Sequence, residues 1–525
     1  MSLKQVPTPD SQRKKMSNHA SRTHGSLSAD DAQLAALGYK STFERSMGLW
    51  QNFALGFTFL SPVVAAYTLF SFGITSGGPP FIWSYLGAGI GQMLVCLIFG
   101  EVVSQFPISG GLYPWNRRLV GAKWAWMGGW MYAWALITTA SAVSVGAAPF
   151  FALLLGFATT PANTTVIAIV LLITTTVLNL LGTKTLARVA MFGFICEVVG
   201  ALFVSGYLLL FGRLHAIHVT VETFSFGSGS SYLPAFLAAA LVGMFACYGF
   251  EGCGDMAEET PNPSKTVPRA MRMTIYIGIP VTIFACLALL LALPDIQAAI
   301  SGKDADPVNT ILVHAFGPIG ARVVYGIVLI SHVSCVLSLL AAVSRLLYAY
   351  ARDKMLVGSS VLSRISPKTH IPAAALVTAA VVAGAIDCVG FFLPDALTAI
   401  VNFAVVGIYV AFQMVVIGAL YARLRGWRPS GQFTLGRWGW TVNLLAIAYG
   451  SGAALNILWP HTPSAPWFIN YAMLLSLAVV FGAGVIYLVL GRPQNKSDAP
   501  AGDAWRMSQK AVSSTPHTME VAGEG

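Results

Sequence analysis

Long apolar runs recur along this chain from about residue 50 to residue 490, and short polar segments separate them. About 20 consecutive apolar residues in a helix cross the hydrocarbon layer of a bilayer, which is about 30 Å thick. The pattern therefore predicts an all-α integral membrane protein with about twelve transmembrane helices. Their approximate ranges are 50–74, 81–104, 123–152, 164–181, 187–211, 232–254, 270–293, 320–350, 372–393, 397–422, 438–458 and 466–490.

Composition agrees with this pattern. Apolar residues make up 56% of the 525 residues and charged residues only 10%, whereas soluble domains carry about 25% charged residues. A surface so poor in charge has to face lipid. The seven cysteines fall in or beside apolar runs without a CxxC pair, so we expect neither a metal site nor a cofactor.

The distribution of basic residues orients the helices. If the N-terminus is cytoplasmic, all but three of the 31 Lys and Arg residues fall on the inner side; the exceptions are Arg213, Lys303 and Arg322. Inner loops of membrane proteins are enriched in this way. We therefore expect a multi-pass cell-membrane protein with both termini in the cytoplasm. The net charge of +10 then reflects the inner loops, and a nucleic-acid partner is not expected.

The chain is expected to have three parts. Residues 1–45 are polar and predict a cytoplasmic N-terminal tail that is mostly disordered, and 46–492 are expected to form the domain of twelve membrane-spanning helices. Residues 493–525, rich in small and polar residues, predict a second cytoplasmic tail, which its composition marks as disordered.

Two predicted helices carry residues that break a helix. The first contains Leu60, Ser61, Pro62 and Val63, with the proline in mid-span, and the sixth contains Cys247-Tyr248-Gly249-Phe250-Glu251. Ordinary kinks are the alternative, but irregular backbone in a membrane is tolerated where it lines a cavity. Because the two breaks lie five helices apart, we expect inverted repeats at about 50–211 and 232–422, with extra helices at 438–490. The nine residues named here are our candidates for substrate binding.

Several motifs resemble those of the amino acid–polyamine–organocation superfamily, and most of all its amino acid/choline branch of GABA and choline permeases. The resemblance runs from Leu34 to Arg492. Its motifs are Leu34-Ala-Ala-Leu-Gly-Tyr-Lys40, Glu101-Val-Val-Ser-Gln-Phe-Pro-Ile-Ser-Gly-Gly-Leu-Tyr113, Tyr248-Gly-Phe-Glu251 with Ala257-Glu-Glu-Thr-Pro-Asn-Pro263, and Ser344-Arg-Leu-Leu-Tyr348 with Ala351-Arg-Asp353. It implies the five-plus-five inverted-repeat (LeuT-type) fold plus two helices. It also implies import of an amino acid or a derived amine coupled to an ion gradient, usually of protons.

The first helix departs from the family pattern. Many relatives have a glycine-rich break there, whose amides hold the substrate carboxylate, whereas this chain has Leu60-Ser61-Pro62. Proline has no N–H to donate. Choline, ethanolamine, polyamines and ω-amino acids therefore remain alternative substrates.

Ionisable residues inside the membrane are the candidates for ion coupling, because burying them is costly. Glu197 lies near mid-membrane in the fifth helix, at a position that resembles the one where some proton-coupled relatives place a lysine in the space of a sodium ion; here the residue is acidic. We expect it to carry the coupling proton, with sodium as the alternative ion; a permanently protonated structural acid is the other interpretation. Ser331 and His332 in the eighth helix are further ion-coupling candidates, or packing residues. Glu251 either pairs with a cationic substrate or caps the broken helix.

Other classes of function have less support. The acids Asp255, Glu258 and Glu259, with the basic residues Lys265, Arg269 and Arg272, predict a charged inner loop that is either a cytoplasmic latch or solvated. We find no nucleotide-binding motif and no catalytic cluster, so an enzyme is not expected. A nutrient sensor on the same scaffold is the competing hypothesis. We expect the partners to be a small-molecule substrate, a proton or Na⁺, and the lipid bilayer.

Overall fold

The computed structural model describes residues 28–227, 231–392, 394–461 and 465–513. The chain divides into two compact units, residues 1–41 and 42–525. The first contains the short helix α2 (Ala29–Ala36), which begins where the Ser28 hydroxyl accepts a hydrogen bond from the Asp31 amide at 3.1 Å. Such a cap satisfies an N–H group that the helix leaves unpaired. Part of the N-terminal tail predicted to be disordered is thus helical, and residues 1–27 lie outside the described residues.

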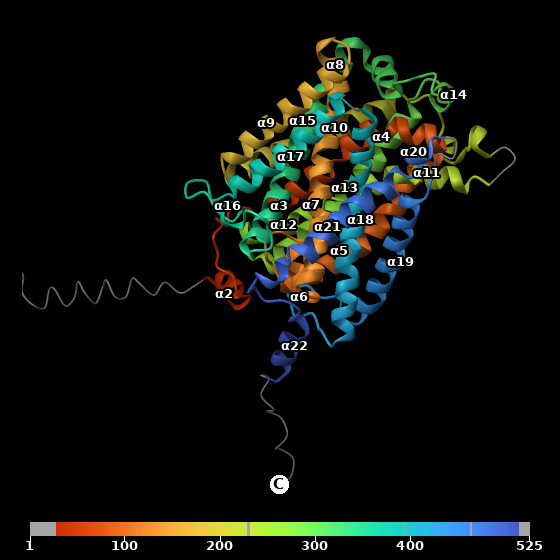
Figure 1. Ribbon diagram of the computed structural model, residues 1–525. Coiled ribbons are helices and arrows are strands. Elements are labelled where there is room, and N and C mark those ends of the chain that lie inside the picture. The colour runs from red at the N-terminus through yellow and green to blue at the C-terminus, as the bar shows by residue number, and fades with distance from the viewer. Residues whose placement is uncertain (1–27, 228–230, 393, 462–464, 514–525) are drawn as a thin grey trace, which may run out of the picture. The chain divides into compact units, whose positions relative to one another are not determined.

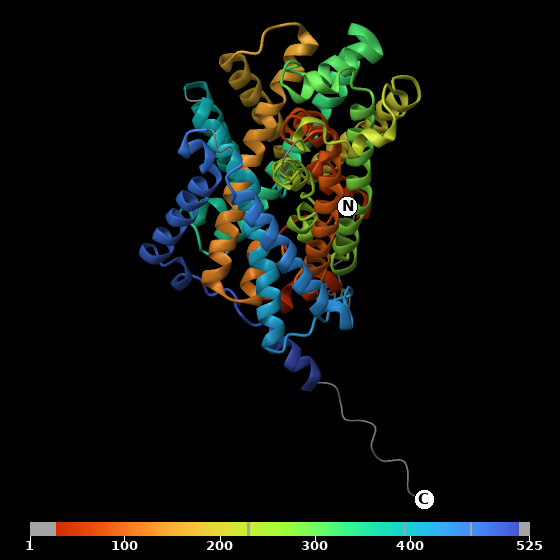
Figure 2. The same ribbon diagram turned by 90° about the vertical axis from the view of Figure 1, so that its right-hand side faces the viewer.

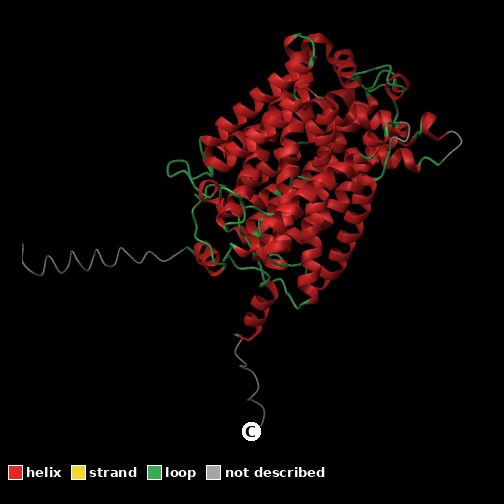
Figure 3. Ribbon diagram, in the orientation of Figure 1, coloured by secondary structure: helices red, strands yellow, loops and turns green. Residues whose placement is uncertain are grey.

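The second unit consists of helices and loops over its described residues (Figure 3). Eleven helical segments within the described ranges are long and apolar enough to cross a membrane. They are α3 (Leu49–Leu60) with α4 (Pro62–Gly77), α5 (Trp83–Gln105), α7 (Ala122–Gly146) with α8 (Ala148–Leu155), α9 (Pro161–Leu180), α10 (Thr183–Phe211), α13 (Pro263–Leu291), α15 (Pro307–Arg352), α17 (Ala373–Phe392), α18 (Pro394–Leu424), α19 (Gly439–Leu458) and α21 (Ala472–Leu490). Each overlaps one predicted span.

The remaining predicted span, 232–254, is divided. It contains α11 (Leu233–Ala246), which is apolar but only 14 residues long, and the single turn α12 (Gly252–Asp255). The eleven segments and this divided span together account for the twelve predicted spans. The prediction of an all-α membrane protein is confirmed.

The helix α15 is longer than its predicted range of 320–350. Inside it Gly317 has a φ of 69°, so that two helical pieces meet at a kink, and Pro318 follows. Proline lacks the N–H group that a continuous helix would use. The apolar run predicted from the sequence corresponds to the piece after this kink.

The helices pack into a bundle in which α7 contacts α18, α5 contacts α13 and α10 contacts α15 (Figures 1 and 2). The first span, α3 with α4, is almost entirely buried, whereas Gly484 is the one buried residue of α21. Exposed apolar residues such as Val479 and Leu490 suit contact with lipid. The chain is a multi-pass membrane protein with α3 and α4 at its centre.

Candidate functional site at two broken helices

The first break lies between α3 and α4. Ser61 joins them in the left-handed conformation, with φ 47°, and Pro62 is the first residue of α4. Proline suits the first position of a helix, because the N–H group of a residue at that position would have no acceptor within the helix. A left-handed serine is strained, by about 1–3 kcal/mol, and such strain is concentrated at functional sites. The break predicted at Ser61-Pro62 is therefore a true interruption of the helix.

Glu197 from α10 fills the N-terminus of α4. One carboxylate oxygen, Oε1, accepts hydrogen bonds from the Ser61 hydroxyl at 2.7 Å and from the Val63 amide at 2.9 Å. The side chain is 0% exposed. Its other oxygen, Oε2, has no hydrogen-bond partner among the described residues. The N-terminus of a helix attracts negative charge, which favours a carboxyl group at this position. Its two hydrogen bonds connect the fifth span, α10, to the break in the first.

The second break follows α11. Gly249 has a φ of 114°, and its amide donates to Glu251 Oε2 at 2.8 Å. A Cβ atom on Gly249 would lie 2.5 Å from the Leu60 amide nitrogen, closer than atoms can approach. Glycine is therefore required where the two breaks touch. Glu251 bonds to its own broken segment, and its Oε1 has no partner among the described residues.

A small void of about 20 Å³ lies between the two breaks. Such a volume holds about one water molecule. Its lining residues are Phe59, Leu60, Val64, Ala65, Thr139, Val143, Phe245, Tyr248 and Cys335. The hydroxyls of Thr139 and Tyr248 lie 3.4 Å apart and are the polar groups of an otherwise apolar wall. A substrate larger than water enters only if side chains move.

The structure brings only some of the predicted substrate-binding residues to this void. Leu60 and Tyr248 line it, whereas the Cys247 thiol lies 3.6 Å from the Tyr85 carbonyl oxygen. Phe250 does not line the void; its ring packs edge-to-face against Phe412, with the ring centroids 5.6 Å apart. Among the lining residues that we did not predict, Thr139 left a signal, because a pair of threonines interrupts the third apolar run.

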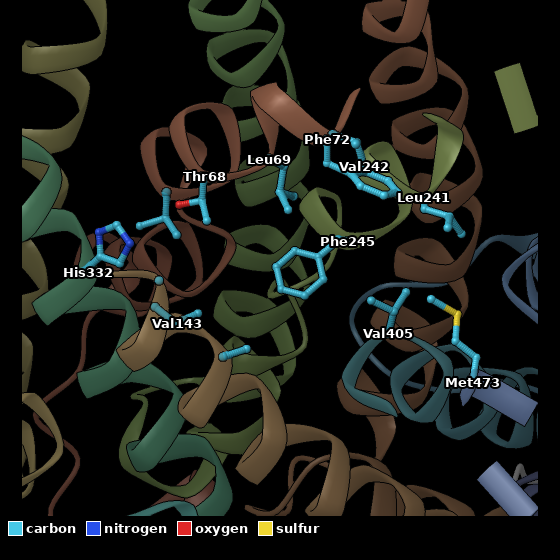
Figure 4. A pocket seen from close by; sticks show the side chains of 13 residues that line it. Thr68, Leu69, Phe72, Val143, Leu241, Val242, Phe245, His332, Val405 and Met473 are labelled. Atoms are coloured by element: carbon cyan, nitrogen blue, oxygen red, sulfur yellow. The ribbon is translucent and has the colours of Figure 1, made fainter. Parts of the chain in front are cut away.

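A larger cavity of about 290 Å³ lies beyond the void, toward Gly77 at the end of α4. Figure 4 shows Phe245 in the middle of its lining, with His332 and Thr68 on one side and Val405 and Met473 on another. The full lining is Val64, Thr68, Leu69, Phe72, Ala142, Val143, Gly146, Leu241, Val242, Phe245, His332, Val405 and Met473. Because Phe245, Val64 and Val143 line both spaces, these three side chains separate the void from the cavity.

The side chains of His332 and Ser331 have different surroundings. The Nδ1 atom of His332 is 2.8 Å from the carbonyl oxygen of Val328, so Nδ1 carries the hydrogen and Nε2 is an acceptor. No partner for Nε2 lies among the described residues, and the ring lines the cavity. The Ser331 hydroxyl donates to Ile327 in its own helix at 3.1 Å, an ordinary packing contact for a serine in a membrane helix.

The opposite end of the bundle, where α3 begins, contains buried ion pairs. We call it the inner end, after the expectation from the basic residues that it faces the cytoplasm. Glu259 accepts two bonds from Arg345 of α15, at 2.8 and 3.2 Å, and a third from Thr183 at 2.6 Å. Glu258 pairs with Arg352 at 2.9 Å. Both acids are 0% exposed. For the three acids the solvated loop is wrong, because all three are buried: α15 supplies an arginine for Glu258 and another for Glu259, and Asp255 accepts a hydrogen bond from the Tyr132 hydroxyl at 2.9 Å.

Comparison with known proteins agrees with this architecture. The family model described as "Amino acid permease" matches residues 47–481. Amino-acid permease 2 of Neurospora crassa is 25% identical, over 89% of this chain and 88% of its own length. Amino-acid permease BAT1 of Arabidopsis thaliana is 24% identical, over 87% of this chain and 90% of its own length. A homolog of that permease from Oryza sativa subsp. japonica is 26% identical, over 83% and 88%.

The fold and the paired breaks thus define a multi-pass transporter. This chain belongs to the amino acid permease family, which supports a transporter of amino acids, and its permease relatives indicate a transporter rather than an enzyme.

Proposed function

We propose that the protein imports an amino acid or an amino-acid-derived amine by alternating access, and that an inward flow of protons drives it. Substrate would bind between the two breaks, against Leu60, Tyr248 and Thr139. Broken helices near the midplane form the binding site in transporters built from inverted repeats, and we assign 50–211 and 232–422 as those repeats. Both termini would then lie in the cytoplasm.

The environment of the Glu197 carboxyl group is the observation that carries this proposal. Its carboxyl group is buried on the two donors at the start of α4, and no ion pair of Glu197 exists among the described residues. An ionised carboxyl in such a place is costly. Binding of a proton would remove the negative charge that the start of α4 attracts, which would tie protonation to movement of the broken helix. His332, on the wall of the outer cavity, would serve as a relay.

The two ends of the bundle support alternating access. The inner end is closed by the pairs that Arg345 and Arg352 make with the segment after α12, while the cavity of about 290 Å³ lies on the other side of the breaks. This arrangement fits a state that faces outward. Phe245 would move aside to admit substrate, and separation of the ion pairs would then release it inward.

The same geometry bears on the substrate. The Val63 amide at the start of α4 is taken by Glu197, and Pro62 has no amide hydrogen. The substrate's α-carboxylate therefore lacks these donors while Glu197 occupies them. The void offers apolar walls and two hydroxyls. We favour a small substrate whose amine approaches Tyr248, since ammonium groups bind aromatic faces; choline, ethanolamine and polyamines are the alternatives within this class.

A ligand screen tests this proposal. Purified protein is heated with amino acids, GABA, choline, ethanolamine and polyamines, and the apparent melting temperature is measured. A specific ligand at about 100 times its Kd stabilises the folded state by about 2.7 kcal/mol, so we expect one chemical class to stand out.

Two variants provide the control. Tyr248→Leu should abolish the thermal shift, whereas Phe250→Leu should preserve it, because Phe250 does not line the void. If no amino acid or amine shifts the melting temperature or enters proteoliposomes, the proposal fails. Binding without any transport would instead favour a nutrient sensor.

A further inference from the structure

The segment after the last spanning helix folds back onto the inner end of the bundle. It lies beyond residue 481, where the family match ends, and it contains the helix α22 (Ala504–Ser513). This helix contacts α6 (Leu112–Leu119) and α18, and Figure 1 shows it next to α6. The composition predicts a disordered tail, but residues 497–508 contact the bundle through hydrogen bonds and an ion pair.

Arg117 of α6 is the centre of this contact. Its guanidinium group donates to the carbonyl oxygens of Ala499 at 2.6 Å and Pro500 at 3.1 Å, and to the Ser497 hydroxyl at 2.8 Å. Its own carbonyl accepts from the Gly502 amide at 2.8 Å. Arg117 is 1% exposed. Three donors and one acceptor of a single buried residue thus hold the tail, and hydrogen bonds to charged groups are the stronger kind.

Further contacts fix the rest of the segment. Arg118 pairs with Asp503 at 3.2 Å. The Ser508 hydroxyl lies 3.1 Å from both the amide nitrogen and the carbonyl oxygen of Arg428, just after α18. Ala504 is fully buried. The contact surface for the tail therefore reaches from α6 to the end of α18, and the defined contacts with it are spread over residues 497–508 of the tail.

The same arginine also touches the closed inner end. Arg117 lies 3.6 Å from Asp353, which follows α15, and Tyr113 of α6 donates to that carboxylate at 3.0 Å. The loop before α6 is bound as well, because Ser109 and Glu258 exchange two hydrogen bonds, at 3.0 and 3.1 Å. The tail, α6, the end of α15 and the acidic segment after α12 thus form one continuous set of contacts.

We propose that residues 496–508 are an intramolecular latch that keeps the inner end closed, and that Arg117 and Arg118 form its docking surface. Release of the latch frees Arg117 and so loosens the link between α6 and α15, which must part from the acidic segment when the inner end opens. This inference rests on the proposed function, since it needs the inner end to open during transport.

A reversible cross-link tests the latch. Arg428→Cys and Ser508→Cys are introduced together, in protein whose less buried cysteines are removed by Cys196→Ser and Cys388→Ser. Oxidation should join the tail to its seat and lower the initial rate of uptake about tenfold, as a shift of about 1.4 kcal/mol in the open–closed equilibrium would. Reduction should restore the rate. Each single-cysteine variant is the control, and an unchanged rate after complete cross-linking overturns the proposal.

A second measurement needs no substrate. Gly502→Val should displace the latch, because Gly502 has a φ of 62° and a Cβ there would lie 3.0 Å from the Val120 carbonyl oxygen. Amide hydrogen exchange of residues 247–262 should then be faster than in the unaltered protein. Faster exchange in a protein that transports no amino acid or amine would show that the tail holds the inner end closed and would refute the proposed function. Unchanged exchange in a protein with normal uptake would refute the latch alone.

Discussion

Replacing Glu197 by glutamine is expected to abolish proton-driven accumulation of substrate and to leave exchange of substrate for substrate intact. The amide oxygen of glutamine can still accept from the Ser61 hydroxyl and the Val63 amide, so the start of α4 keeps its cap. Only the ability to bind and release a proton is lost. The measurement is uptake of labelled substrate into proteoliposomes, with and without an imposed pH gradient.

A pH difference of about one unit corresponds to about 1.4 kcal/mol per proton, enough for about tenfold accumulation of a neutral substrate. In Glu197→Gln the internal concentration should stop at the external one. Glu251→Gln is the matched control, because this acid is equally buried but bonds within its own broken segment. Full accumulation by Glu197→Gln would show that the proton binds elsewhere.

Replacing Arg345 by methionine should destabilise the protein strongly. The Glu259 carboxylate is 0% exposed and would lose its charged partner, and breaking one side of a buried pair costs about 3–5 kcal/mol. Adding Glu259→Gln to the same chain should recover most of this loss, since no uncompensated charge would then remain. The apparent melting temperature in detergent measures both variants.

Arg352→Met serves as a comparison for that experiment. The Arg352 side chain is 16% exposed, so water can enter the space that it leaves, and Glu258 keeps the hydrogen bond from the Ser109 amide at 3.1 Å. The loss of stability should therefore be smaller. Equal melting temperatures for Arg345→Met and the double variant would mean that the pair with Glu259 does not hold the inner end together.

The pattern of the sequence anticipates the helices well, because apolar length is what a membrane selects. Pro62 in mid-span and the glycines after Cys247 also disclose both breaks, since each is a local property of the backbone. The depth of Glu197 follows from its distance along one helix. Such features need no knowledge of which helices are neighbours.

Contacts between side chains on different helices could not be predicted from the sequence. Asp387 interrupts a predicted span without an evident role, and in the structure its carboxylate accepts a hydrogen bond from Ser141 of α7. The pairing of Glu259 with Arg345 joins residues 86 positions apart. The polar composition after residue 492 likewise predicts disorder. In the structure this tail is ordered by hydrogen bonds to Arg117, which lies far away in the sequence, so its order could not be predicted from composition.

The most direct test of the account is accumulation by the purified protein in proteoliposomes under an inward proton gradient. The substrate is the labelled compound that stabilises the protein most in the thermal screen. We expect it to rise above its external concentration, by about tenfold for each pH unit at one proton per substrate, and to return to equality when a protonophore collapses the gradient. Internal label that never exceeds the external level, or that follows a sodium gradient and ignores pH, would contradict proton-coupled transport by this protein.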